Sequence, residues 1–172
     1  MLRALLLTFG LLLIHVLTSH LVASTVLPPS LPLSSNGSYW HNWADEFGVT
    51  HLTQCSFKNW TEKNLLPPSD PLFLDVFGTA QNIQLSNQPP GWQGPWHRDP
   101  VPQLVVFLQG VGLWKFMDGT QHFFYPGDVY FGNDQNSTQG HESYTYGNET
   151  LIVVMIQFPQ LSTTMGKPCW LQ

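Results

Sequence analysis

The chain has 172 residues, of which 6 are Lys or Arg and 11 are Asp or Glu, so its formal net charge is −5 at pH 7. A sparsely charged, mildly acidic surface argues against nucleic acid and anionic membranes as partners. The 7 Trp and 11 Phe residues supply material for an apolar pocket, so the composition favours a small hydrophobic or aromatic molecule as the ligand.

The first segment, residues 1–24, is predicted to be a signal peptide. Arg3 precedes an apolar run from Ala4 to Val22, and the small residues Ala23 and Ser24 follow it, which is the pattern of a cleaved secretory signal. A single-pass anchor is the alternative, but the run is short for a bilayer, contains polar positions and is followed by no basic cluster. We therefore expect no stable membrane insertion after cleavage.

Residues 25–38 form a Pro/Ser-rich segment with little periodicity, which predicts a linker. Four Asn-X-Ser/Thr triplets are spread over the chain, more than chance predicts, and they indicate passage through a glycosylating compartment. Their acceptor residues are Asn36, Asn59, Asn136 and Asn148. We therefore expect a protein that is secreted or resides in the lumen of the secretory pathway, with all four segments at its surface.

The two cysteines, Cys55 and Cys169, are expected to form a disulfide, because a lone pair of cysteines in an oxidising compartment is most simply bonded. A metal pair is less favoured at that separation. The chain-entropy model assigns about 4 kcal/mol to closing so long a loop, less any strain.

Residues 39–172 are enough for one domain with its own core. Turn formers recur at short intervals, no long stretch has the helical period, and the only helical candidate is a turn or two around Trp43–Phe47. The β-branched and aromatic runs between the turns predict an all-β sandwich or barrel. These runs are Val49–Phe57, Leu72–Val76, Ala80–Leu85, Gln103–Leu108, Leu113–Met117, Gln121–Tyr125, Val129–Phe131, Ser143–Tyr146 and Leu151–Phe158.

Two motifs in the second half of the chain have a recognisable spacing. The first contains Gly91, His97, Asp99, Gln103 and Gly110. The second combines the turn Pro126-Gly127-Asp128 with the pair Gly140-His141, and a sequon-bearing loop separates its two parts. This arrangement resembles the two motifs of the cupin superfamily, and most closely the small single-domain cupins of fungi and bacteria.

The resemblance implies a single cupin-type (jelly-roll) β-barrel with its site between His97 and His141, and it is compatible with a homodimer. It also implies an enzyme that tailors natural products. In the family, His and Glu stand where this chain has Asp99 and Gln103. Because a neutral amide binds a divalent metal less well than a carboxylate does, Gln103 weakens the expected metal site.

The two motif histidines are the leading catalytic candidates. Two motif positions on adjacent strands of a narrow barrel can point into the same mouth, so we expect His97 and His141 to converge. Since histidine titrates near neutrality, the pair can act as acid and base while Gln103 and Asp99 orient it or the substrate. The tryptophans expected to line the pocket are Trp92, Trp96 and Trp114.

A metal centre is the alternative use of the same residues. The ligands would then be His97, His141 and Gln103, and the metal would be iron, manganese, nickel or zinc. His97 and Asp99 with the distant His141 also have the form of a two-His, one-carboxylate set, which binds iron or manganese with open positions for substrate or oxygen.

These four residues also have structural interpretations. His97 could terminate a strand at the rim, and His141 follows a glycine and a polar loop. Asp99 precedes a proline and is a typical turn former. Gln103 could be an inward amide paired with backbone.

Four other polar residues are expected to have no part in the site. Asp128 belongs to a Pro-Gly-Asp turn. Asp134 lies in the sequon-bearing loop and is expected to be solvated. His51 and His122 lie inside strand-like runs and are expected to be packing or surface residues.

The leading functional prediction is a secreted isomerase, cyclase or lyase that acts on a small hydrophobic or aromatic natural product by proton transfer in the barrel mouth. The alternatives are a mononuclear metal-dependent oxygenase and a non-catalytic secreted protein that binds a small molecule. Elemental analysis of the purified protein for a bound metal distinguishes the oxygenase from the other two. Co-purification of an unaltered ligand would favour the non-catalytic binding protein.

Overall fold

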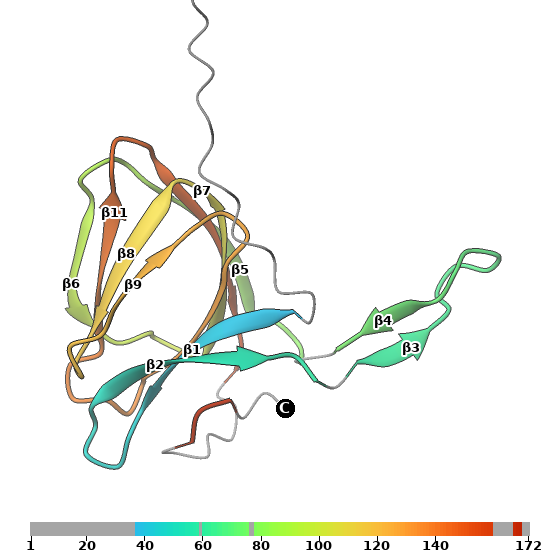
Figure 1. Cartoon of the computed structure of the whole chain (residues 1–172), viewed down its shortest axis with the longest axis horizontal. Helices are drawn as coiled ribbons and strands as arrows, with labels where there is room; N and C mark the ends of the chain where they lie inside the picture. Colours follow the sequence, from blue (N-terminus) through green and yellow to red (C-terminus); the bar gives the residue numbers. More distant parts are fainter. Residues whose placement is uncertain (1–36, 59, 76–77, 160–166, 170–172) are drawn as a thin grey trace, which may run out of the picture. The chain divides into compact units, whose positions relative to one another are not determined.

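The computed structural model describes residues 37–58, 60–75, 78–159 and 167–169, and the regular elements in these ranges are all β-strands (Figure 1). The all-β prediction is therefore confirmed. The strands are β1 (Ser38–Ala44), β2 (Thr50–Ser56), β3 (Thr61–Lys63), β4 (Leu72–Leu74), β5 (Asn82–Gln88), β6 (Gln93–His97), β7 (Gln103–Gln109), β8 (Val111–Phe116), β9 (Gln121–Phe124), β10 (Val129–Asn133), β11 (His141–Tyr146) and β12 (Leu151–Gln157).

Several sequence predictions lie outside the described residues. They are the signal peptide, residues 25–36 of the linker, and the acceptor residues Asn36 and Asn59. Within the described ranges, no helix is long and apolar enough to cross a membrane.

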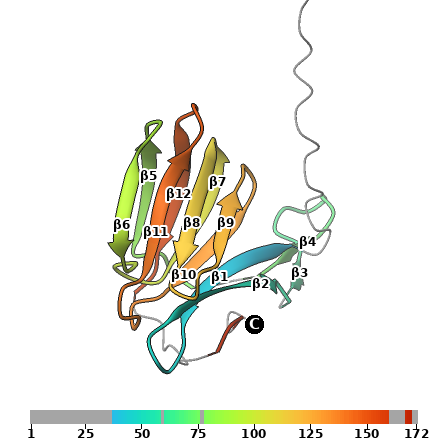
Figure 2. The same ribbon diagram turned by 60° about the vertical axis from the view of Figure 1, so that its left-hand side comes forward.

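The described strands form three sheets (Figure 2). The largest has the order β2-β1-β10-β7-β12-β5, the second has the order β6-β11-β8-β9, and β3 and β4 pair only with each other. Strand β1 pairs with β10 in parallel, whereas its pairing with β2 is antiparallel. None of these sheets closes on itself, so the described residues form open sheets rather than a barrel closed by hydrogen bonds.

The main core lies between the six-stranded and four-stranded sheets. The six-stranded sheet contributes Val105, Phe107, Tyr130, Leu151 and Val153, and the four-stranded sheet contributes Trp114, Phe116 and Phe124. The rings of Trp114 and Tyr130 meet edge to face with centroids 4.3 Å apart. Side chains alternate between the faces of a strand, so this core fixes which residues of each strand point inward.

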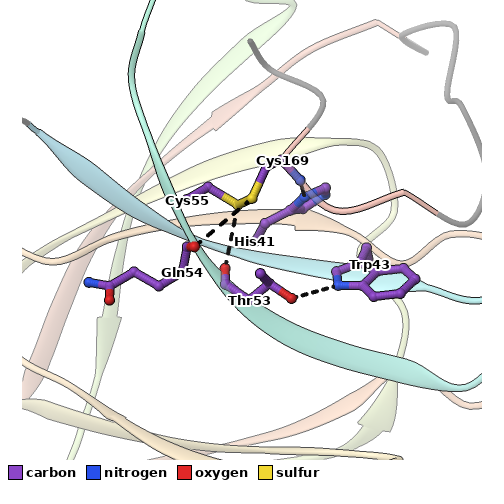
Figure 3. The surroundings of a disulfide bond; sticks show 6 residues. All are labelled: His41, Trp43, Thr53, Gln54, Cys55 and Cys169. Carbon is purple, nitrogen blue, oxygen red and sulfur yellow. Dashed lines mark hydrogen bonds between the residues drawn. A yellow bond between two sulfur atoms is a disulfide. The ribbon is translucent and has the colours of Figure 1, made fainter.

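A second apolar cluster covers part of the opposite face of the six-stranded sheet, and it contains Tyr39, Cys55, Leu104, Phe131 and Phe158. Cys55 is bonded to Cys169, with Cα atoms 5.4 Å apart (Figure 3). The predicted disulfide is therefore confirmed. The backbone N–H of Cys169 also donates to His41 Nδ1 at 2.9 Å, so the bonded segment is held to β1 as well as to β2.

The helical turn expected at Trp43–Phe47 is wrong. Strand β1 continues to Ala44, and the Asp45 carboxylate then accepts hydrogen bonds from the backbone N–H groups of Phe47 and Val49, each at 2.9 Å. The backbone N–H of Asp45 also donates to the carbonyl oxygen of Val49 at 3.0 Å, so these residues close a turn between β1 and β2 instead of starting a helix.

Strands β1, β3 and β6 were not predicted, and β6 shows why. Its sequence contains Gly94 and Pro95, residues that normally argue against a strand. However, β6 lies at the edge of its sheet, where proline is tolerated because no ladder hydrogen bond is lost on the open side. The same strand ends on His97, so an irregular edge supplies one of the two motif histidines.

Candidate functional site

The site begins where β6 ends and β11 starts. His97 and His141 are register partners of these two strands, and the register shifts between His141 and Ser143. Their imidazole rings have centroids 4.5 Å apart. Bulges are frequent beside active sites because they redirect a side chain. The predicted convergence of these two histidines is thus present in the structure.

The two histidines differ in their surroundings. His97 is exposed, and its Nδ1 lies 2.6 Å from the carbonyl oxygen of Pro95. His141 is buried, and its Nδ1 lies 2.8 Å from Oδ2 of Asp134. A nitrogen that faces a carbonyl or a carboxylate oxygen carries the proton. In both rings, Nδ1 is therefore the donor and Nε2 is the atom left for proton exchange.

Asp134 is the residue that the sequence reasoning missed. It was expected to be solvated, but it is completely buried. Besides His141, its carboxylate accepts from the backbone N–H of Asp99 at 2.8 Å and from Nδ2 of Asn42 at 2.9 Å. A signal was present in the sequence, since Asp134 follows Tyr130 by four residues and Gly132 by two. Side chains of a strand alternate between its two faces, so this spacing predicts that Asp134 points inward like Tyr130 and Gly132.

Asp99 is also buried and belongs to the same network. Its carboxylate accepts from Tyr130 Oη at 3.0 Å and from Gln103 Nε2. A Cβ atom at Gly132 would collide with this carboxylate, so the glycine makes room for it. Asp99 therefore acts as the link between Asp134, which its backbone binds, and Gln103.

Gln103 stands on β7, in the sheet opposite the two histidines, and both ends of its amide are engaged. Nε2 donates to Asp99, while Oε1 accepts from Gln157 Nε2 at 3.2 Å. Gln157 in turn accepts from Asn82 Nδ2 at 3.2 Å. The structure thus places Gln103 in the network behind Asp134, not beside His97.

The charges of the site follow from these contacts. Burial alone would lower the pKa of His141, but the charge of Asp99 and the hydrogen bond and charge of Asp134 outweigh it and raise that pKa. Burial alone would raise the pKa of Asp134, but the hydrogen bond and charge of His141, with the other two donors, hold it below its usual range. An imidazolium paired with a carboxylate is the resulting state.

The pKa values of the second histidine and the second aspartate of the site shift in the opposite directions to those of His141 and Asp134. Burial, followed by the charge on His141, lowers the pKa of His97. Burial and the charge of Asp134 raise the pKa of Asp99 to about 7. Burial and then the charge of Asp99 keep the pKa of the Tyr130 phenol well above its usual value, so Tyr130 remains a donor. Near neutral pH, His141 is therefore the acid and His97 the base of the pair.

The three candidate tryptophans are placed differently. Trp114 is buried in the core with its ring centroid 5.3 Å from that of His141. Its Nε1 is buried and finds no hydrogen-bond partner in the described residues. Trp96 is exposed beside His97, and Trp92 is half-buried. Trp114 is thus the tryptophan in ring contact with the acid of the pair.

Two histidines outside the site have contacts of their own. His51 lies between two carboxylates, with Nε2 3.0 Å from Asp45 Oδ2 and Nδ1 3.0 Å from Asp118 Oδ2. It thereby joins the turn after β1 to the turn after β8. The ring of His122 packs on that of Trp40, with centroids 3.9 Å apart.

The predicted metal set of His97, His141 and Gln103 stays a prediction, and the rings of its two histidines have centroids 4.5 Å apart. The group of three potential ligands found in the described residues is Asp99, Asp134 and His141, whose ligand atoms all lie within 4.8 Å of one another. The contacts described above already use Nδ1 of His141 and both carboxylates, since Asp134 has three donors and Asp99 has two. A network whose acceptors are already satisfied by protein donors fits a metal ion poorly.

The acceptor residues Asn136 and Asn148 are both exposed, as a glycan requires, and Asp128 accepts from the backbone of Tyr125 within its turn. Glycosylation of the two asparagines stays a prediction.

Comparison with known proteins gives little. No protein-family model and no curated protein match the chain. Among solved structures, protein NMB1881 from Neisseria meningitidis is 14% identical over 45% of this chain and 72% of its own, with a TM-score of 0.36. The conserved SPY1581 protein of unknown function from Streptococcus pyogenes is 16% identical over 45% of this chain and 64% of its own, with a TM-score of 0.35. The resemblance to cupins stays a prediction, and the interpretation of the site depends on this chain's own residues.

Proposed function

We propose that this protein is an acid–base enzyme, an isomerase, cyclase or lyase, that acts on a small hydrophobic or aromatic molecule through His97 and His141. The observation that carries the proposal is the hydrogen bond from His141 Nδ1 to the buried Asp134, directly beside the exposed His97. A carboxylate on Nδ1 fixes the tautomer of an imidazole and stabilises its protonated form, which prepares Nε2 to donate a proton.

In this mechanism, His97 removes a proton from a C–H bond of the substrate through Nε2, and His141 delivers a proton from Nε2 to another atom. The pair exchanges protonation states in each turnover, and solvent restores them through the exposed His97. Asp134 stabilises the imidazolium, while Asp99 and Asn42 position Asp134 by donating to it. The aromatic rings of the core suit an apolar substrate.

We further propose that the fold is a cupin-type jelly roll and that the protein is secreted. Strands β5 to β12 are divided between the two larger sheets in the orders β5-β12-β7-β10 and β6-β11-β8-β9, and this division supports an arrangement of eight strands in two Greek keys. The disulfide and the exposed residues Asn136 and Asn148 support an oxidising, glycosylating compartment.

Deuterium exchange tests the reaction without knowledge of the product. The protein is incubated in D₂O with small aromatic ketones, enones and lactones, and deuterium uptake at the acidic C–H position is followed by NMR. We expect uptake that is lost in His97→Gln and His141→Gln but kept in His122→Gln, a matched change of a half-buried histidine outside the site. Equal uptake by all four proteins would contradict the assignment. Binding of an unaltered ligand without exchange would instead favour the non-catalytic alternative.

A metal-dependent oxygenase is the second candidate, because Asp99, Asp134 and His141 lie within reach of one ion. The protein donors that already bind both carboxylates, and the use of Nδ1 of His141 in one of these bonds, speak against it, and we derive no step through a metal. Elemental analysis of the purified protein decides the matter, since stoichiometric iron, manganese, nickel or zinc that is lost in Asp99→Asn would favour this candidate over acid–base catalysis by the two histidines alone.

A further inference from the structure

We propose that Ser143 is a further catalytic residue, whose hydroxyl donates a hydrogen bond to the carbonyl oxygen of the substrate while His97 removes the proton from the adjacent carbon. The inference rests on the acid–base function proposed above and deepens it by naming the substrate class. That class comprises ketones, enones and lactones, in which a C–H bond next to a carbonyl group can be broken to give an enolate. Neither histidine of the pair needs to serve this oxygen.

Ser143 lies next to the histidine pair on the inner face of its sheet. It follows His141 by two residues on β11, and its register partners are Gly94 on β6 and Trp114 on β8. Residues two apart on a strand point to the same face, and Ser143 is only 5% exposed. Its side chain therefore belongs to the layer of inward residues that directly follows the layer of His97 and His141.

Three side chains converge over Gly94, which has no side chain of its own. A Cβ atom at that position would lie 2.6 Å from Ser143 Oγ, 2.8 Å from the ring of Trp92 and 3.2 Å from Cε1 of His97. In an imidazole, Cε1 is bonded to Nε2, the atom of His97 that is left for proton exchange. A hydroxyl, the base and an aromatic ring therefore meet in one small region. This grouping suits an apolar substrate that carries a carbonyl oxygen beside its acidic C–H bond.

The hydroxyl of Ser143 has no hydrogen-bond partner among the described residues, although the residue is almost completely buried. Buried hydroxyls of native proteins are normally paired, and an unpaired one lowers stability. Thr145, two residues further along the same face, follows this rule and donates to the carbonyl oxygen of Gln88 at 3.3 Å. Ser143 is therefore a buried donor beside the base that remains available to a substrate oxygen.

The indole of Trp114 is another buried donor, but it is placed less well. Its Nε1 has no partner within the described residues, and it lies 3.5 Å from the position that a Cβ would take at Gly112. On β8, Gly112 is on the side of Trp114 opposite to Phe116, the register partner of His141. The indole N–H is thus further from the histidine layer, so we assign the substrate oxygen to Ser143.

The reaction step conserves atoms and electrons. Nε2 of His97 takes the proton from the carbon next to the carbonyl group, the electrons of that C–H bond form a C=C bond, and the carbonyl π electrons move to the oxygen. The hydroxyl of Ser143 stabilises the negative charge that develops there. Nε2 of His141 then delivers a proton to the same carbon or to a conjugated one, and the carbonyl group is restored.

Ser143→Ala tests the assignment in the deuterium-exchange assay, and Thr145→Val is the matched loss of a buried hydroxyl on the same strand. We expect the maximal exchange rate of Ser143→Ala to fall about 100-fold with little change in KM, because the donor acts mainly on the charged oxygen of the transition state. Thr145→Val should exchange like the wild type when both are folded. The unfolding midpoint of Ser143→Ala should not fall, since removal of an unpaired hydroxyl leaves no protein group unsatisfied.

Binding of two small ligands separates this inference from the reaction itself. Phenol presents an oxygen on a ring, as an enolate of an aromatic ketone does, and toluene has nearly the same shape without that oxygen. In NMR titrations, the ratio of the phenol to the toluene dissociation constant should rise about fivefold in Ser143→Ala, the effect of one neutral hydrogen bond.

The possible outcomes distinguish the two proposals. Normal exchange and an unchanged ratio in Ser143→Ala would overturn the role of Ser143 and leave the assignment of His97 and His141 intact. A changed ratio in a protein whose wild type catalyses no exchange would overturn the reaction, and with it catalysis by Ser143. A lower unfolding midpoint in Ser143→Ala would also overturn the proposal, since the hydroxyl would then have a structural partner.

Discussion

Substitution of Asp134 is the most informative change to the site, because the carboxylate of this residue accepts hydrogen bonds from three donors. In Asp134→Asn, the amide oxygen can still accept from the backbone of Asp99, but the amide NH₂ then faces two donors, His141 Nδ1 and Asn42 Nδ2. Breaking a buried ion pair by removing one partner typically costs about 3–5 kcal/mol, and we expect a loss of that size in the free energy of unfolding.

The loss should depend on pH in a defined way. The folded pKa of His141 is raised, so its contribution is complete below the unfolded value of 6.5 and is lost as pH rises through the folded value. The folded pKa of Asp134 is lowered, so its contribution is complete above the unfolded value of 3.8 and is lost as pH falls. The difference between wild type and Asp134→Asn should therefore be greatest between pH 3.8 and 6.5.

Urea unfolding across this pH range measures the difference, and NMR titration of His141 gives a second readout, since its pKa should fall in the variant. Asp128→Asn is the matched control, because that half-buried carboxylate belongs to a turn outside the site and, within the described residues, accepts from the backbone of Tyr125. A cost below about 1 kcal/mol, well under the range for a broken buried pair, together with an unchanged His141 pKa, would refute the assignment of this pair.

Three further outcomes are expected. Burial lowers the pKa of His41 from 6.5 to about 3, so folding stability should fall with pH below 6.5, by about 2 kcal/mol at pH 5, and the unfolding profile of His41→Gln should lack this component. Cys55→Ala with Cys169→Ala opens a loop with a sequence separation of 114 and should cost about 4–5 kcal/mol in urea unfolding, whereas a loss below 1 kcal/mol would contradict the entropic account. Gly140→Ala should cost more than about 2 kcal/mol, because Gly140 has φ 88° and a Cβ would collide with the backbone of His97; Gly127→Ala, with a similar φ but open space, should cost clearly less by thermal unfolding.

The sequence predicted the strands whose side chains alternate in a regular way, such as β8 and β12, because burial of one face imposes that pattern. It predicted the disulfide because only one pairing of the two cysteines exists. It failed at β6, where an edge position tolerates Pro95, and at Trp43–Phe47, where the side chain of Asp45 decides the local conformation. The local hydrophobic pattern of the sequence shows neither the position of a strand in its sheet nor the hydrogen bonds that one side chain makes to the backbone.

The site was predicted in part for a similar reason. The motif spacing brought His97 and His141 together, as the structure shows, but it gave no hint that Asn42, from the start of the domain, would donate to Asp134 and Tyr130. Long-range contacts of this kind depend on how the sheets are assembled. Asp134 was misjudged because a sequon-bearing loop suggested solvent, whereas its position two residues beyond the inward Gly132 indicated burial.

The position of Asn42 on β1 also sets the order in which the site can form as the chain is made. Asn42 is among the first described residues to be synthesised, yet its partners Tyr130 and Asp134 follow 88 and 92 residues later. The strand that pairs with β1 in parallel, β10, is equally late. Contacts so distant in sequence form slowly because the loop entropy must be overcome first. We therefore expect β1 to pair with β10, and the Asn42 amide to find its partners Tyr130 and Asp134, only after most of the domain has left the ribosome.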